Sequence, residues 1–288
     1  GEVLYDFPSP NYGPPEQGLA FTRDLIQTWQ VDPLISVAVE PHAVYTCSPD
    51  LLYACRDIAE DFRVPMIIHL SESQDEVNQV KERYGLSPVY HLEKLELLSP
   101  RLIADHCVVL TEEEMDILAE RGVRVVHNNE SNMKLANGVA PVAKLLELGV
   151  VVGLGTDGCA SNNNLDMLAE MDSVAKLHKV YRMDPTIMDA KTVVRLATRG
   201  GARVLGLDEQ IGSLEPGKKA DLIGLDLDKP HLTPLYNIYS HVVYAASAAD
   251  VTLNIINGRV VMRDGELLTL DVEKVMAEVR AIAKKIKS

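Results

Sequence analysis

The chain has 288 residues, 47% of them hydrophobic, and can bury a large core in one α/β domain or in a domain with an appendage. Its 28 lysine and arginine residues against 42 aspartate and glutamate residues give a formal net charge of -14, which disfavours nucleic acid and anionic membranes as partners. Four scattered cysteines without a CxxC pair predict free thiols and a cytoplasmic location. No apolar run is as long as a membrane-spanning helix, and no signal-peptide pattern is visible.

Strands and helices are expected to alternate from the amino terminus. Residues 1–18 are rich in proline and glycine and predict a loop, which a helix over 19–29 follows. Ser48 and Pro49 predict the start of a helix, and Thr111 with Glu114 predicts a capping box at the start of another. Strands are expected at 34–39, 65–68, 102–104, 123–126 and 150–152, and further helices at 76–84, 91–98, 141–148 and 166–179.

The five strands are nearly all apolar, which predicts a parallel sheet covered by helices on its faces. In such sheets, and above all in (β/α)8 barrels, the chemistry lies at the carboxyl ends of the strands. Ionisable residues stand at all five of these ends, where chance is a poor explanation. They are His42, His69 with Glu72, His106, His127 and Asp157.

Asp157 lies in the sequence VVVGLGTDGCAS, directly after a run of valines. A buried, ionised carboxylate is costly unless it is paired or bound to a metal. Asp157 therefore either caps a loop or helix or holds a cation, and the sequence around it leaves both alternatives open.

The pattern changes after about residue 198. Short β-type runs with the turn signals Asn257-Gly258 and Asp264-Gly265 predict hairpins, and 271–287 predicts an amphipathic helix. We expect a barrel domain over 1–208 and a small β-domain with a C-terminal helix over 209–288.

Several motifs together resemble the amidohydrolase superfamily, and within it the deaminases of S-adenosylhomocysteine and 5-methylthioadenosine and the chlorohydrolases of aminotriazines. The resemblance covers nearly the whole chain. It rests on PHAVYTCS, IIHLSE, ADHCVVLTEEE, HNNESNMKLANGVAPV, VGLGTDGCASNNNLDM, IGSLEPGKKADL and INGRVVMRDGEL.

The resemblance implies an α/β fold, a (β/α)8 amidohydrolase barrel with a small β-sandwich. It implies one divalent metal, zinc or else iron, with His69 and Asp157 as ligands. Glu72 would be the proton shuttle, and His106 would polarise the reacting centre; both would contact the substrate. Three further residues would line the substrate pocket, namely His42, His127 and Ser161.

These residue types suit hydrolytic deamination. A divalent metal lowers the pKa of bound water to about 7, Asp157 can accept that water's proton, and Glu72 can protonate a ring nitrogen. The expected reaction releases ammonia from an adenosine-like nucleoside, a small-molecule substrate. The alternatives are triazine dechlorination or guanine-type deamination in the same site, and a metal-free binding or scaffold protein.

The family's first barrel strand carries an HxH pair of metal ligands, and no HxH occurs in this sequence. The chain also begins with Gly1 rather than methionine, and only five of eight strand–helix units can be counted. We therefore expect a barrel that is incomplete at its amino terminus. Three explanations remain open: the chain is part of a longer enzyme, it is a truncated relative without metal, or another chain supplies the missing units. The resemblance also makes a homo-oligomer possible.

Overall fold

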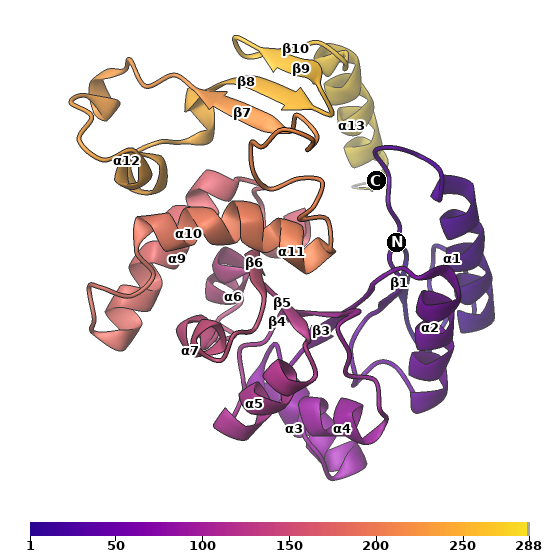
Figure 1. Ribbon diagram of the computed structural model, residues 1–288. Coiled ribbons are helices and arrows are strands. Elements are labelled where there is room, and N and C mark those ends of the chain that lie inside the picture. The colour runs from indigo at the N-terminus through magenta and orange to yellow at the C-terminus, as the bar shows by residue number, and fades with distance from the viewer. Residues whose placement is uncertain (287–288) are drawn as a thin grey trace.

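Residues 1–286 are described by the structure, a computed structural model, and the part up to Leu205 is a row of short parallel strands with helices between them (Figure 1). Hydrogen bonds join β1 to β2, and they join β3 to β4, β4 to β5 and β5 to β6. Parallel bridges at Val39–Met66 and Ala43–His69 connect these two groups of strands. The strands are β1 (Val3–Leu4), β2 (Glu40–Pro41), β3 (Met66–Leu70), β4 (Leu102–His106), β5 (Arg124–His127) and β6 (Val152–Leu154).

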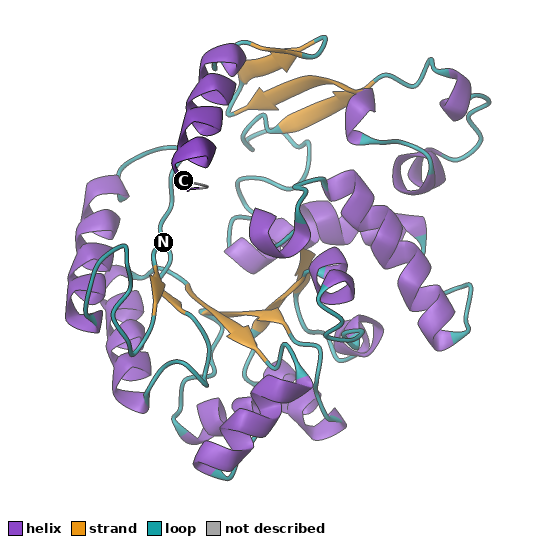
Figure 2. Ribbon diagram, turned by 180° about the vertical axis from the view of Figure 1, so that it is seen from behind, coloured by secondary structure: helices purple, strands orange, loops and turns teal. Residues whose placement is uncertain are grey.

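Helices connect successive strands and follow the outer side of the curved row (Figure 2). Within residues 1–286, no hydrogen-bonded pairing joins β1 to β6, so the paired strands form an arc. The helices are α1 (Pro15–Trp29), α2 (Pro49–Phe62), α3 (Gln74–Tyr84), α4 (Pro88–Lys94), α5 (Glu112–Glu120), α6 (Asn129–Lys134), α7 (Val142–Glu147), α8 (Cys159–Asn162), α9 (Met167–Arg182), α10 (Ala190–Arg195), the π-helical turn η1 (Leu196–Gly200) and α11 (Gly201–Leu205).

Local sequence signals explain where several helices begin. The Ser48 hydroxyl accepts a hydrogen bond from the amide of Leu51 at the start of α2, and Thr111 and Glu114 form the predicted capping box at the start of α5. Each of these contacts satisfies a backbone N–H that has no partner within the helix.

The apolar core lies between the strands and the surrounding helices. Ile68 and Leu70 of β3 are fully buried there with Leu52 of α2 and Leu118 of α5. Each such side chain contributes on the order of 2 kcal/mol through burial. Alternate strand residues, among them His69, face the other side of the sheet. The arc therefore has an apolar outer face and an inner face that carries polar residues.

The amino-terminal region differs from the expectation. The segment predicted as a loop over 1–18 contains β1 and the first residues of α1, and the strand predicted over 34–39 is displaced to Glu40–Pro41. The Asp32 carboxylate accepts hydrogen bonds from the amides of Leu34 and Ile35, which holds that stretch in a turn. Residues 1–286 thus contain six strands in this parallel row, where the sequence indicated five.

The remaining elements form an antiparallel sheet with the order β10-β9-β8-β7 and a C-terminal helix. Both predicted hairpin turns are confirmed, since Asn257 and Gly258 have φ of 47° and 77°, and Asp264 and Gly265 have φ of 50° and 81°. This one sheet is the part of the expected β-sandwich that residues 1–286 contain. The domain boundary expected between residues 208 and 209 stays a prediction. The elements are β7 (Leu222–Leu225), η2 (Pro230–Leu232), α12 (Ile238–Tyr244), η3 (Ala248–Asp250), β8 (Val251–Ile256), β9 (Arg259–Arg263), β10 (Glu266–Leu267) and α13 (Val272–Ile286).

Within residues 1–286, no helix combines the length and the apolar character needed to cross a membrane.

Candidate active site

Three predicted histidines lie next to one another at the carboxyl ends of adjacent strands. The ring centroids of His42 and His69 are 4.9 Å apart, and those of His69 and His106 are 5.4 Å apart. The Glu72 Oε1 lies 3.9 Å from the His106 Nε2. The parallel register of the strands thus brings together residues that are up to 64 positions apart in the sequence.

The backbone turns sharply where these strands end. Ser71, His106, Cys107 and Asp157 have φ of 51°, 70°, 49° and 60°, the left-handed region that residues other than glycine seldom adopt. Such conformations cost free energy and cluster at functional sites. At His106 the turn is at the last residue of β4 and redirects the side chain at the end of the strand.

His69 has the contacts expected of a metal ligand. Its Nδ1 lies 2.8 Å from the main-chain oxygen of His42, which can only accept a hydrogen bond. Nδ1 therefore carries the proton, and Nε2 is left with its lone pair. A backbone carbonyl in this place fixes the tautomer and orientation of metal-binding histidines.

Asp157 is held in its charged form by hydrogen bonds. Burial by itself would raise its pKa, but the Ser131 hydroxyl donates to Oδ2 at 2.6 Å and the Gly158 amide donates to Oδ1 at 2.6 Å. These bonds, with smaller contributions from His106 and Ser161, lower the pKa of Asp157 below its usual value. An ionised carboxylate at this strand end suits either a metal ligand or a proton acceptor.

The neighbouring imidazoles are neutral near pH 7. Burial, followed by the proximity of His69, lowers the pKa of His42 to about 4. Burial also lowers the pKa of His106, although Glu72 opposes this effect. The His42 Nδ1 is hydrogen-bonded to the Thr46 hydroxyl at 2.8 Å. Both rings are therefore placed to exchange hydrogen bonds with a ligand rather than to carry a fixed charge.

Ser161 and His127 have different surroundings. Ser161, in α8, lies close enough to Asp157 to help lower its pKa. His127 is fully buried, and its Nε2 lies 3.1 Å from the Nε2 of His178 in α9. It lies in β5 two residues after the core residue Val125 and so faces the surrounding helices. His127 thus packs against His178, and it is still near enough to His106 that this ring, after burial and His178, lowers the pKa of His127.

Four further residues at this site were not indicated by the sequence analysis. Ser131, Asn132 and Asn137 contact Asp157, His106 and Glu72 respectively, from α6 and the loop after it. Asp105 lines the inner face beside His69, and burial raises its pKa to about 7. The polar stretch SNMKLAN, which begins four residues after the end of β5, was the available signal for the first three.

The metal-ligand set is incomplete in the described part of the chain. No cluster of three or more His, Cys, Asp or Glu side chains arranged for a metal occurs within residues 1–286. His69 and Asp157 have the donor chemistry that zinc or iron prefers, but a four-coordinate site needs further ligands.

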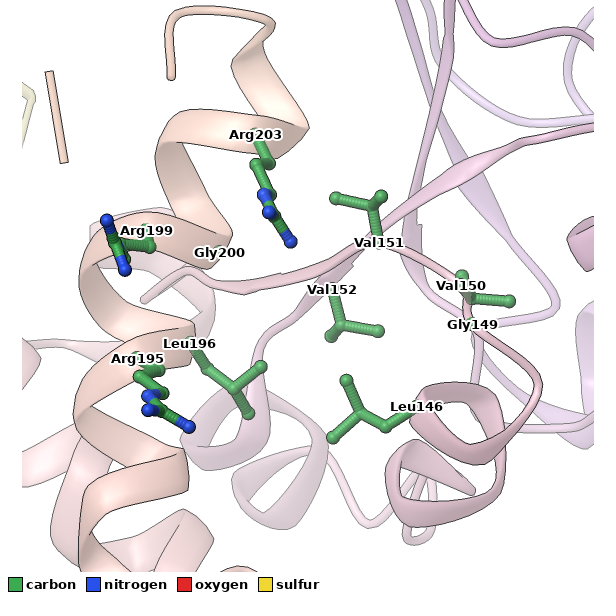
Figure 3. A pocket seen from close by; sticks show the side chains of 10 residues that line it. All are labelled: Leu146, Gly149, Val150, Val151, Val152, Arg195, Leu196, Arg199, Gly200 and Arg203. Carbon is green, nitrogen blue, oxygen red and sulfur yellow. The ribbon is translucent and has the colours of Figure 1, made fainter. Parts of the chain in front are cut away.

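Two cavities within residues 1–286 lie beside strands β3 and β6. One of about 200 Å³ is on the inner face and is lined by His42, His69 and Asp105, among others. The other, of about 400 Å³, lies at the amino end of β6. It is lined on one side by Val150, Val151 and Val152 and on the other by Arg195, Arg199 and Arg203 of α10, η1 and α11 (Figure 3). The second cavity contains none of the predicted site residues, so the inner-face cavity is the one that fits the chemistry of the strand ends.

Comparison with known proteins gives a consistent family. The model of the amidohydrolase family matches residues 3–261. A 5-methylthioadenosine/S-adenosylhomocysteine deaminase of Syntrophobacter fumaroxidans is 63% identical over 287 residues, which cover 100% of this chain and 66% of that protein. A protein of the same description from Syntrophus aciditrophicus is 53% identical over 287 residues, which cover 100% of this chain and 65% of its own. The chain thus spans slightly less than two thirds of the length of these curated relatives.

Solved structures agree with this assignment. An adenosine deaminase from Xanthomonas campestris with bound zinc superposes with a TM-score of 0.96 at 40% identity, covering 99% of this chain and 65% of that one. A mutant atrazine chlorohydrolase from Arthrobacter aurescens, complexed with zinc and atraton, has a TM-score of 0.87 at 26% identity, covering 92% and 59%. The predicted barrel fold is confirmed by these neighbours, and zinc is present in both of them.

Proposed function

Because the chain belongs to the amidohydrolase family, we propose that it acts as a metal-dependent hydrolytic deaminase of an adenosine-like nucleoside: S-adenosylhomocysteine, 5-methylthioadenosine or adenosine. The observation that carries this proposal is the meeting of His69, Glu72 and His106 at adjacent strand ends in a chain 63% identical to a named deaminase of the first two nucleosides. Ammonia is the expected product.

The proposed metal is one Zn²⁺, or else Fe²⁺, held in part by the Nε2 of His69 and the carboxylate of Asp157. Bound there, such an ion lowers the pKa of water to about 7 and so supplies hydroxide at neutral pH. Groups other than His69 and Asp157 would fill the remaining coordination positions of the metal. Zinc in two similar solved structures supports the choice of metal.

Glu72 is proposed to move the proton. Its Oε1 accepts a hydrogen bond from the Asn137 amide at 2.9 Å, while 26% of its side chain is exposed. The carboxyl group can therefore reach a ligand from a fixed position and protonate a ring nitrogen, which makes the carbon that bears the amino group electrophilic.

Asp157 and His106 are proposed to act on the attacking water. The ionised Asp157 can accept its proton, and the neutral His106 can orient it through Nε2. His42, on the other side of His69, is proposed to contact the nucleoside, together with Ser161. Water loses two protons in this reaction. Asp157 accepts one of them and passes it to the amino group, which leaves as ammonia. Glu72 gives its proton to the ring nitrogen and regains the other one from the added hydroxyl as the carbonyl forms.

Ammonia release from S-adenosylhomocysteine, 5-methylthioadenosine and adenosine by the purified, metal-analysed native protein tests the proposal. Stoichiometric zinc or iron together with ammonia release supports it. Chloride release from a chlorotriazine without deamination would favour the dechlorination alternative, and release from guanine alone would favour guanine deamination. A protein that binds the nucleosides without metal or turnover would be the binding or scaffold alternative.

Two other expectations remain proposals. Cys47, Cys55 and Cys107 are buried free thiols and Cys159 is an exposed one, which fits the proposed cytoplasmic location. A homo-oligomer is proposed on the family resemblance alone, and sedimentation of the native protein would test it.

A further inference from the structure

One short segment, α6 and the loop after it, contacts three of the proposed catalytic side chains. From α6, Ser131 donates to Asp157 and Asn132 contacts His106, and from the following loop Asn137 donates to Glu72. These three catalytic candidates come from different strand ends. A single local segment therefore sets their relative positions.

Asn132 is the most unusual member of this segment. Its side chain is 1% exposed, and its Oδ1 lies 2.9 Å from the Nδ1 of His106. Its Nδ2 is buried and has no hydrogen-bond partner among residues 1–286. A buried donor without a partner lowers stability, and an apolar side chain of similar size would remove that cost. Stability alone thus does not explain an asparagine in this place.

The contact determines where the proton of the neutral His106 ring lies. A neutral imidazole has one N–H and one lone pair. Because Oδ1 can only accept, the proton lies on Nδ1, and Nε2 keeps its lone pair on the side of Glu72, 3.9 Å from its Oε1. The Nε2 can then accept a hydrogen bond from a protonated Glu72 or from water. A proton on Nε2 would instead attract the Glu72 carboxylate and hold it in its ionised form.

We propose that Asn132 is a positioning residue that selects the Nδ1–H tautomer of His106 and so leaves Glu72 free to carry the proton. The effect on catalysis rests on the proposed deaminase function. The tautomer itself does not, because it follows from the contact between Asn132 and His106.

The substitution Asn132→Leu removes the acceptor, and Asn129→Leu is its matched control. Asn129 lies in the same helix, is also 1% exposed and also has one buried amide atom without a partner, its Oδ1. Its Nδ2 donates to Ser173 at 3.1 Å rather than to a catalytic candidate. Both changes therefore remove a comparable amide, and only one of them touches His106.

Two measurements on the native protein decide the proposal. Histidine ¹⁵N NMR near neutral pH should show a proton on Nδ1 of His106 in the wild type and in Asn129→Leu, and its loss from Nδ1 in Asn132→Leu. The kcat for deamination should fall on the order of 10- to 100-fold in Asn132→Leu with little change in KM, the range typical of residues that orient a catalytic group through a hydrogen bond. In Asn129→Leu the kcat should stay near the wild-type value.

A proton on Nε2 of His106 in the wild type would overturn the proposal, even if Asn132→Leu did not fold. An unchanged tautomer in a folded Asn132→Leu would overturn it too, as would equal losses of kcat in the two variants. If the wild type releases no ammonia, the proposed function fails by itself, and the NMR result still decides the role of Asn132.

Discussion

The substitution Glu72→Gln separates proton transfer from folding at this site. Glutamine keeps an oxygen that can accept the hydrogen bond from Asn137, which Glu72 now accepts at 2.9 Å. The amide has no proton that it can transfer. General acid–base catalysis contributes roughly 10²–10⁴-fold, so kcat/KM should fall by that factor, or about 2.7 to 5.4 kcal/mol at 1.36 kcal/mol for each factor of ten.

Stability and metal content should change little in the same variant. The Glu72 side chain is 26% exposed, and its neighbour His106 is largely neutral at pH 7 because burial lowers its pKa, so little ion-pair energy is lost. The proposed ligands His69 and Asp157 are not altered. Metal analysis and thermal unfolding should therefore match the wild type.

The assay is ammonia release from each nucleoside, with Glu82→Gln as the control. Glu82 is an exposed glutamate of α3, and its substitution removes the same charge away from the strand ends. If Glu72→Gln keeps more than about a tenth of the wild-type kcat/KM, general acid–base catalysis by this group is excluded, because its smallest usual contribution is larger.

Three more predictions concern the metal, the pH dependence of stability and the packing of β6. Asp157→Ala should lose both bound metal and ammonia release; metal that survives dialysis of this variant would contradict the role as ligand. Burial lowers the pKa of His178 to about 4, so between pH 6.5 and 4 the unfolded chain binds a proton that the native state does not, and stability falls as the pH falls. Through this group, the free energy of unfolding at pH 5 is about 2 kcal/mol lower than at pH 8. Between these two pH values, the free energy of unfolding of His178→Phe, measured in urea, should therefore fall by about 2 kcal/mol less than that of the wild type. Gly153→Ala should lower the free energy of unfolding by about 1–3 kcal/mol because its Cβ would lie 2.9 Å from the Cα of Gly201. Gly158→Ala, which meets no atom within 4 Å, is the control, and equal losses would refute the packing argument.

Local signals in the sequence determined a large part of this fold. The capping box at Thr111 and the hairpin turns at Asn257 and Asp264 depend on neighbouring residues only, and they formed as predicted. The apolar strands predicted the parallel sheet. The ionisable residues that follow them predicted that the candidate site lies at the carboxyl ends of these strands. These features could be predicted because each depends on a few adjacent residues, or on the rule that parallel strands end at one edge.

The direction of each side chain at a strand end was decided only by the tertiary structure. His106 and His127 are both the last residue of a parallel strand, yet the first lies beside His69 and the second packs against His178. The difference follows from the backbone, since His106 has φ of 70° and turns at the strand end, whereas His127 keeps the alternation of β5. Asn132 likewise meets His106 only through packing of α6 across 26 residues of sequence. The sequence determined which groups are available for the chemistry, and long-range packing decided which of them meet.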